Sequence, residues 1–206
     1  MEKDTRTKLI EIATEMFATK GFSAVSVREI TTAANVNVSA ISYYFDSKEG
    51  LYQTILKEQL TPILQALRSV QGNALFTPIR RLTSYADQIA RINMQRPFLA
   101  RLMTNEITNP TEYGGQIVEK HISQMYEFMA AALQDGMANG DFRRDLNIGY
   151  TAISLAGIIN FYFITRPINQ KFIPLTEKSN EEYVAHAFRG YLYGITNPKK
   201  VRSEFD

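Results

Sequence analysis

Polar, small and aromatic side chains are concentrated between residues 26 and 48, in the stretch SVREITTAANVNVSAISYYFDSK. Hydroxyl, amide and cationic groups can donate hydrogen bonds to phosphate oxygens, and small side chains on a helix can lie against the edges of bases. Each residue also has a structural alternative, since an aromatic ring can pack in a core and a serine can cap a helix. The candidate binding residues are Ser26, Arg28, Asn37, Val38, Ser39, Ala40, Ser42, Tyr43, Tyr44 and Lys48.

Two short helices joined by a tight turn are predicted to position these side chains. Ser26 and Glu29 have the spacing of a capping box, which starts a helix. Asn35 can end that helix, because asparagine tolerates the left-handed backbone conformation. A second short helix is predicted from Val38 to Phe45. This arrangement is a helix-turn-helix, whose second helix enters the major groove of DNA while the first lies across the backbone.

Within this segment the apolar residues have a separate task from the polar ones. We expect one set to be buried together and to fix the angle between the two helices: Ile30, Ala33, Ala34, Val36 and Ile41, with Phe45 as an anchor. Tyr43 is then expected to face outward and donate to a phosphate, and Tyr44 could do the same or join the core. Lys48 falls in the first turn of the next helix, where a cation is unfavourable unless an anion such as a phosphate lies there.

Helical periodicity continues on both sides of this segment. An N-terminal helix is predicted to end at Gly21, with Phe22 folding back on Phe17. A helix capped by Asp46 or Ser47 should be kinked or interrupted at Pro62. Later elements are indicated by Pro78 and Pro97 in first turns, a run from Gln116 to Ala138, an apolar run at 148–165 broken by Pro167, and a second capping box, Ser179 with Glu182, that opens a helix reaching about Gly194. The expected fold is all-α, with about nine helices and no sheet.

Composition excludes several classes of site. The chain of 206 residues has no cysteine, so disulfides and thiolate sites are ruled out. Its net charge is +2, and residues 1–48 contain six Lys or Arg against six Asp or Glu, so a nucleic-acid surface must come from arrangement. We find no nucleophile–base signature, and His121 and His186 do not have metal-ligand spacing. No signal peptide or membrane span is predicted. We therefore expect a cytoplasmic non-enzyme without cofactor or metal.

The C-terminal part is rich in aromatic and methionine side chains, which can line an adaptable apolar pocket or simply form a core. Candidate ligand-binding residues are Phe98, Leu102, Met103, Glu106, Met125, Met129 and Phe161. Glu106 could anchor a cationic or hydroxylated ligand, or it could pair with Arg101 or cap a neighbouring helix. The helices at about 148–165 and 180–194 are candidates for dimerisation, with Ala152, Ala156 and Gly157 allowing close approach; the first could equally be the buried centre of its own domain.

The segment LIEIATEMFATKGFSAVSVREITTAANVNVSAISYYFDSKEGLYQTIL, residues 9–56, resembles the TetR family of bacterial transcriptional regulators. The resemblance implies an all-helical homodimer, an N-terminal DNA-binding domain (1–48), a C-terminal ligand-binding and dimerisation domain (49–206) and an operator with two-fold symmetry. It also implies that ligand binding usually weakens DNA binding. The chain departs from the family pattern at Asn35, where glycine is frequent, at Ser42, where tyrosine is frequent, and at Val38, where a polar or basic residue is frequent. These departures concern which operator is read.

The resulting hypothesis is a repressor that leaves a palindromic operator when a small, largely apolar molecule binds its C-terminal domain. The segments RPFLARLMTNEITNP and GDFRRDLN resemble regulators of the same family that sense toxic or drug-like compounds. The expected partners are double-stranded DNA, a small-molecule effector and a second copy of the chain, and no membrane. One alternative is an activator of the same family. Another is a helical enzyme or carrier that uses its N-terminal helices only as a scaffold.

Overall fold

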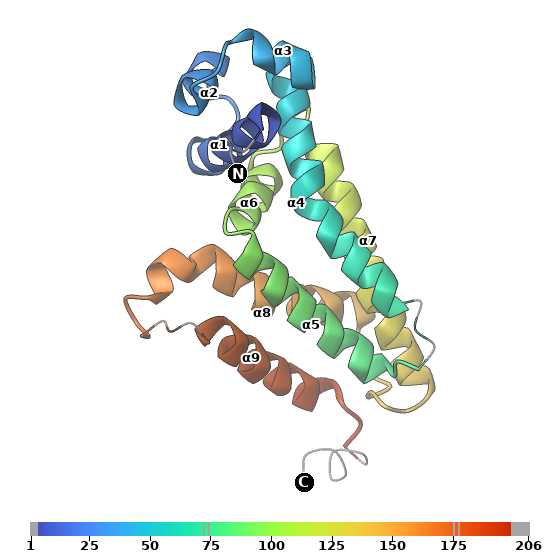
Figure 1. Cartoon of the computed structure of the whole chain (residues 1–206). Helices are drawn as coiled ribbons and strands as arrows, with labels where there is room; N and C mark the ends of the chain where they lie inside the picture. Colours follow the sequence, from blue (N-terminus) through green and yellow to red (C-terminus); the bar gives the residue numbers. More distant parts are fainter. Residues whose placement is uncertain (1–3, 72, 74, 175, 177, 199–206) are drawn as a thin grey trace. The chain divides into compact units, whose positions relative to one another are not determined.

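The computed structural model describes residues 4–71, 73, 75–174, 176 and 178–198 (Figure 1). Helices account for the regular structure of these residues, and no strand occurs among them beyond an isolated bridge between Phe142 and Thr196. The helices are α1 (Thr5–Lys20), α2 (Val27–Ala34), α3 (Ser39–Phe45), α4 (Lys48–Gln71), α5 (Pro78–Gln95), α6 (Leu99–Thr108), α7 (Gly115–Ala138), α8 (Ile148–Asn169) and α9 (Ser179–Ile195). The all-α fold predicted from the sequence is confirmed.

Two compact units make up the chain. The first contains the residues up to Thr61 together with Arg96–His121, and the second contains Pro62–Gln95 and the residues from Ile122 onward. Helices α4 and α7 therefore each contribute residues to both units. The division of the chain at residue 48 into a DNA-binding and a ligand-binding domain stays a prediction.

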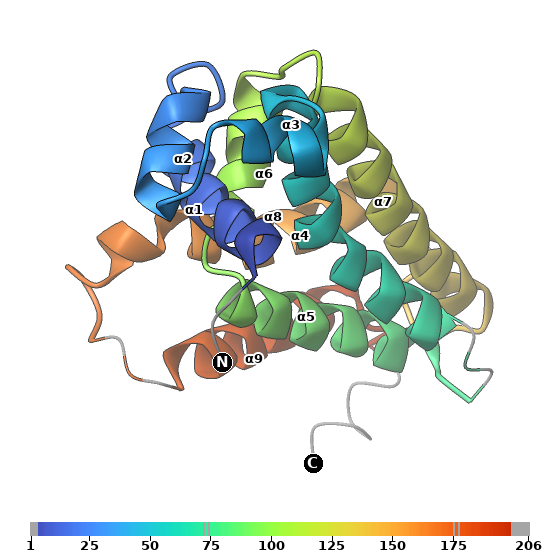
Figure 2. The same ribbon diagram turned by 45° about the horizontal axis from the view of Figure 1, so that its top comes forward.

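The first unit begins with helices whose ends match the sequence signals. Gly21 ends α1 with a positive φ of 83°, and Asn35 ends α2 in the left-handed region with φ 53°. Ser26 and Glu29 form the predicted capping box, since Ser26 Oγ accepts from the Glu29 N–H at 3.2 Å and Glu29 Oε2 accepts from the Ser26 N–H at 2.8 Å. Phe22 folds back on Phe17, with ring centroids 5.7 Å apart. Helix α6 packs on α1 in this unit (Figure 2).

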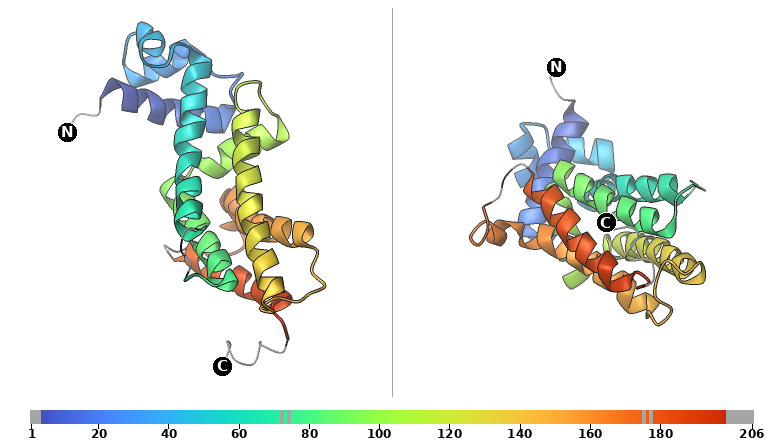
Figure 3. Two further views of the ribbon diagram at one scale, coloured as in Figure 1. Left: turned by 90° about the vertical axis from the view of Figure 1, so that its right-hand side faces the viewer. Right: turned by 90° about the horizontal axis from the view of Figure 1, so that it is seen from below.

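Helices α5, α8 and α9 pack together in the second unit (Figure 3). Two tyrosine hydroxyls join α9 to α8, because Tyr183 donates to the Ile158 carbonyl at 2.8 Å and Tyr191 donates to the Thr151 carbonyl at 3.1 Å. Among the described helices, α8 is the one that has the length and apolar composition to cross a membrane, and 28 % of its most apolar window is buried within the chain.

Pro62 was expected to kink or interrupt its helix, and Pro167 to break the apolar run before it; neither proline interrupts its helix. Helix α4 runs through Pro62 to Gln71, and α8 runs through Pro167 to Asn169. A proline costs one backbone hydrogen bond in a helix interior. In α4 the neighbouring side chains Leu60, Ile63 and Leu67 are buried, and this packing offsets the lost bond.

Two predicted helix starts were also misplaced. Ser179 is not an N-cap, because α9 has Lys178 at that position and Ser179 Oγ instead accepts from the Thr176 N–H at 2.6 Å. Pro97 lies two residues before α6, which starts at Leu99, whereas Pro78 does open α5 as predicted. A local sequence pattern is compatible with more than one position for the start of a helix. In both cases the start differs from the predicted position by one or two residues.

The capping box at the start of α2 gives the first testable prediction. Ser26→Ala should lower the free energy of unfolding by about 1 kcal/mol, because it removes the acceptor of the Glu29 N–H. It should also raise the pKa of the Glu29 carboxyl from about 2, where hydrogen bonds from the Ser26 backbone and hydroxyl and from Lys20 hold it. Urea denaturation and an NMR titration of Glu29 measure both effects. Ser23→Ala is the control, since Ser23 is exposed and lies outside the cap; equal effects of the two substitutions would contradict the assignment.

Candidate DNA-binding surface

The turn between α2 and α3 is fixed by short-range hydrogen bonds. The Val36 N–H donates to the Thr31 carbonyl at 3.0 Å, behind the left-handed Asn35. Asn37 Oδ1 accepts from both the N–H and the hydroxyl of Ser39, each at 2.8 Å. Asn37 therefore shapes the start of α3, and it remains exposed at the same time.

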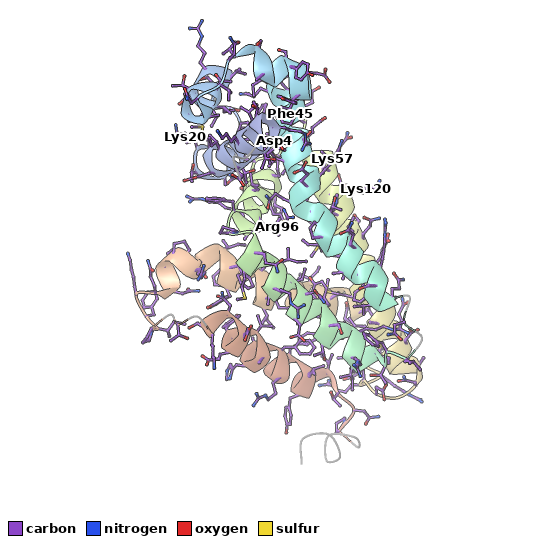
Figure 4. The ribbon with its side chains drawn as sticks, in the orientation of Figure 1. Asp4, Lys20, Phe45, Lys57, Arg96 and Lys120 are labelled. Atoms are coloured by element: carbon purple, nitrogen blue, oxygen red, sulfur yellow. The ribbon has the colours of Figure 1, made fainter. Side chains whose placement is uncertain are left out.

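Apolar contacts hold α2 and α3 in place. Ile30, Ala34, Ile41 and Phe45 are buried as predicted, and Val36 is half-buried. Ala33 is exposed, so its predicted place in this core was wrong. The Arg6 guanidinium lies over the Phe45 ring, 5.5 Å from its centroid. Figure 4 labels Phe45 at the end of α3.

An exposed face remains on α3 and the residues around it. Tyr43 is 81 % exposed and Tyr44 40 % exposed, and their rings meet edge to face with centroids 4.8 Å apart. The other exposed candidates are Ser26, Arg28, Asn37, Val38, Ser39 and Ser42, and Ala40 is half-buried. Nearly all predicted contact residues of the helix-turn-helix are therefore accessible to a partner, and Tyr43 points outward as expected.

Lys48 differs from the other candidate residues, because its ammonium group already donates hydrogen bonds within the chain. Lys48 Nζ donates to the Phe22 carbonyl at 3.1 Å and the Val25 carbonyl at 2.9 Å, and it lies 4.1 Å from the centroid of the Phe22 ring. These contacts tie the start of α4 to the loop that precedes α2. A phosphate contact by the Lys48 side chain would compete with them, so the structure favours a positioning role over the contact that the sequence suggested.

An aromatic cluster extends from these Lys48 contacts toward α6 and the loop that follows it. The Phe22 ring lies 4.8 Å from Tyr52 and 5.4 Å from Tyr113, measured between centroids. Tyr52 Oη donates to Glu106 Oε1 at 2.5 Å, and Glu106 also accepts from the N–H and hydroxyl of Thr111. Burial, and then the Glu106 carboxylate, raise the pKa of Tyr52. Glu106 thus connects α4 to the loop before α7. This role resembles the predicted alternative in which Glu106 caps a neighbouring helix, and it differs from a pairing with Arg101.

The predicted ligand-binding residues do not form one group within a single unit. Phe98, Leu102, Met103 and Glu106 belong to the first unit, whereas Met125, Met129 and Phe161 belong to the second. Leu102, Met125 and Met129 are buried, and Phe98 and Met103 are half-buried. Phe161 is 65 % exposed on α8. Their role in ligand binding stays a prediction, and Glu106 and Phe161 have positions that suit other tasks.

Comparison with known proteins identifies the family of the segment that carries this surface. Residues 9–55 match the family model described as "Bacterial regulatory proteins, tetR family". This segment belongs to the TetR family. That match covers α1 to α3 and the start of α4, which is the part of the first unit that carries the exposed face of α3.

The curated relatives that the chain matches are named as transcriptional regulators. It is 42 % identical over 73 residues to the probable HTH-type transcriptional regulator YttP of Bacillus subtilis, and this match covers 35 % of each chain, about a third of that relative's length. It is 26 % identical over 145 residues to the HTH-type transcriptional repressor DhaR of a Mycobacterium species, covering 68 % of this chain and 71 % of DhaR.

Solved structures share the fold over nearly the whole chain. The ketosteroid transcriptional regulator KstR2 of Mycobacterium tuberculosis is 20 % identical with a TM-score of 0.76, covering 95 % of this chain and 97 % of KstR2. AibR, solved in complex with isovaleryl coenzyme A and operator DNA, is 16 % identical with a TM-score of 0.74, covering 95 % of this chain and 100 % of AibR. At these identities the likeness concerns the fold.

The engagement of Lys48 gives a second testable prediction. Lys48→Met should lower the free energy of unfolding by about 1–3 kcal/mol, because two part-buried carbonyls lose the hydrogen bond from the ammonium group. It should leave the salt dependence of DNA binding unchanged, since the ammonium neutralises no phosphate. Lys57→Met, at an exposed position of α4, is the stability control. A salt slope reduced by about one unit in Lys48→Met would show that Lys48 does bind a phosphate.

Proposed function

We propose that the chain is a repressor that binds a palindromic operator as a homodimer and leaves it when a small organic molecule binds the second unit. The observation that carries this proposal is the exposed face of α3, in which small and hydroxyl side chains on a rigidly held helix are combined with the exposed Tyr43. The family membership of residues 9–55 supports the same reading.

DNA recognition is assigned to α3, with α2 as the supporting helix. Ser39, Ala40 and Ser42 are small, so the helix can approach base edges in the major groove closely, and the hydroxyls of Ser39 and Ser42 can hydrogen-bond to bases. Tyr43 is the phosphate-binding side chain, because its exposed hydroxyl lies at the end of that helix. Arg28 on α2 can reach a phosphate or a guanine edge.

Dimerisation is assigned to α8 and α9, because α8 carries an exposed apolar stripe. Its exposed members follow each other at intervals of three and four residues, which is one face of a helix: Tyr150, Ile153, Gly157, Phe161, Ile164 and Ile168. Exposed Gly190, Tyr193 and Gly194 add to it on α9, and a Cβ built at Gly157, Gly190 or Gly194 would meet no atom within 4 Å. Helices α8 and α9 of two subunits can bury these faces in a four-helix bundle. Ala152, which the sequence suggested for this face, is buried in its own subunit.

Two-fold symmetry of such a dimer explains why the operator should be palindromic. The two α3 helices would enter successive major grooves on one side of the DNA, about 34–36 Å apart. An effector weakens binding when it has higher affinity for a dimer with a different spacing of these helices, and it can shift the equilibrium only by that difference in affinity.

Unpartnered polar groups in the second unit support an effector that combines apolar surface with hydrogen-bonding groups. Among the described residues, the Tyr85 and Tyr162 hydroxyls and Gln124 Oε1 are buried without a hydrogen-bond partner. Each such group costs about 1–3 kcal/mol, which a ligand can recover by bonding to it. Burial also raises the pKa of Tyr85, so its hydroxyl stays a donor. Met125 and Met129 in the same unit are adaptable apolar contacts.

We infer the cellular location and the absence of enzymatic activity from the curated relatives. The curated relatives are named as transcriptional regulators, and the proposed binding to operator DNA supports a cytoplasmic location. The apolar face of α8 is then a dimer interface, which accounts for its hydropathy without a membrane.

An activator would use the same DNA-binding surface as a repressor. Transcript levels of the adjacent genes with and without the protein distinguish an activator from a repressor, since loss of a repressor raises these levels.

The assignments on α3 predict two different kinds of defect. Tyr43→Phe should weaken binding to specific and unspecific DNA alike, by a few-fold, because it removes one phosphate contact. Ser42→Ala should instead change the preferred sequence at one position of each half-site. Fluorescence anisotropy with the operator, with half-site variants and with competitor DNA separates these effects. A purely sequence-specific defect in Tyr43→Phe would contradict its phosphate role.

The apolar stripe predicts the oligomeric state. Phe161→Glu should convert the dimer to a monomer at micromolar concentration and abolish operator binding, because a carboxylate at the centre of the interface loses its hydration. Leu75→Glu is the matched control, since Leu75 is an exposed apolar residue outside α8 and α9. Analytical ultracentrifugation measures the result. A Phe161→Glu protein that remains dimeric would place the interface elsewhere.

A further inference from the structure

A branched apolar side chain stands at the start of the helix that is proposed to contact bases. Val38 directly precedes α3, and 50 % of its surface is exposed. The exposed residues around it, Asn37, Ser39 and Ser42, are polar. Residues in the N-terminal part of a recognition helix lie against base edges in the major groove. In the proposed complex Val38 therefore faces a base, although its side chain can form no hydrogen bond.

Packing within the chain leaves much of Val38 outside. The neighbouring apolar side chains Ile41 and Phe45 are buried and form the contact between α3 and the rest of the unit. Single exposed apolar residues are ordinary on a protein surface. Val38 is distinguished by its place, because the small side chains of Ser39 and Ser42 beside it let its methyl groups reach a base edge.

Hydrogen bonds on both sides hold the backbone at Val38. Asn37 Oδ1 accepts from the N–H and the hydroxyl of Ser39, each at 2.8 Å, and the Val38 carbonyl accepts from the Ile41 N–H at 3.3 Å. A valine has few χ1 rotamers, because its Cβ is branched. The two methyl groups of Val38 are therefore presented in a narrow range of positions, and little conformational entropy is lost when they contact a base.

The four bases differ in what they offer to an apolar side chain. In the major groove guanine, adenine and cytosine present hydrogen-bond donors and acceptors, and thymine adds a C5 methyl group. A valine that covers a donor or an acceptor removes its hydration without replacing the hydrogen bond, which costs free energy. A valine against the thymine methyl group instead removes apolar surface of both partners from water. Val38 is thus complementary to thymine and unfavourable beside the other three bases.

We propose that Val38 recognises the C5 methyl group of a thymine in each half of the operator. This inference rests on the proposed function, because it requires α3 in the major groove. The two copies of Val38 in a symmetric dimer contact two thymines that are related by the two-fold axis of the operator. Val38 is accordingly a residue that determines specificity, whereas Tyr43 contacts a phosphate.

Replacement of thymine by uracil tests the proposal, because uracil lacks only the C5 methyl group. The full-length protein is titrated by fluorescence anisotropy with the operator selected from random DNA, and with duplexes in which each thymine is replaced in turn. At one position of each half-site the replacement should raise Kd about fourfold, and replacement in both half-sites about fifteenfold. A scan in which no replacement raises Kd would overturn the proposal.

A substitution in the protein shows whether Val38 makes this contact. In Val38→Ala the ratio of Kd values for the uracil and thymine duplexes should fall from about four to below about two, because the shorter side chain no longer reaches the methyl group. Far-UV circular dichroism checks the fold, which an exposed position should leave unchanged. Thr32→Ala, at an exposed residue of α2, is the control and should keep the ratio. A ratio that stays at about four in Val38→Ala would assign the methyl contact to another side chain.

Cytosine methylation gives an independent measurement. When the sensitive T·A pair is replaced by C·G, binding should weaken, and a methyl group at C5 of that cytosine should recover about fourfold in Kd, since it stands where the thymine methyl stood. Absence of recovery would contradict a methyl contact. Binding without any sequence preference would overturn the proposed function and this inference together. A preferred operator whose affinity does not respond to uracil would overturn the role of Val38 alone.

Discussion

The ammonium group of Lys48 joins parts of the chain that are more than twenty residues apart. The placement of α3 depends on this connection. Its two bonds, to the carbonyls of Phe22 and Val25, fix the loop from which α2 starts. Helix α2 in turn holds α3 through buried side chains such as Ile30 and Ile41. A helix of seven residues such as α3 is not stable alone, so its orientation toward DNA is entirely a product of this support.

The same support connects to α6 through Phe22, Tyr52 and Glu106. The Tyr52 hydroxyl and the Glu106 carboxylate are both buried, and a buried charge keeps its place only while its donors are present. Contacts from Thr111 through Glu106 and Tyr52 to Phe22 therefore connect the loop before α7 with the loop before α2. Side chains outside the α2–α3 segment thus support the helix-turn-helix within the first unit.

Sequence patterns predicted well whatever depends on neighbours along the chain. The capping box at Ser26, the left-handed Asn35 and the outward direction of Tyr43 are all consequences of local backbone geometry and of a 3.6-residue period. The predictions that were wrong or incomplete involve partners far away in the sequence. The carbonyls that hold Lys48 precede it by more than twenty residues, and the hydroxyl that holds Glu106 is more than fifty residues away. The interruption considered at Pro62 does not occur for a related reason, since the buried apolar side chains around it stabilise a continuous helix.

The most direct test of the central claim, that α3 of a symmetric dimer reads DNA, is selection of binding sites from random duplex DNA by the purified protein. The account predicts a palindrome whose half-site centres are about 10 base pairs or a multiple of that distance apart, bound with an affinity that falls steeply with salt. Recovery of no preferred sequence, or of a single half-site without symmetry, would contradict it.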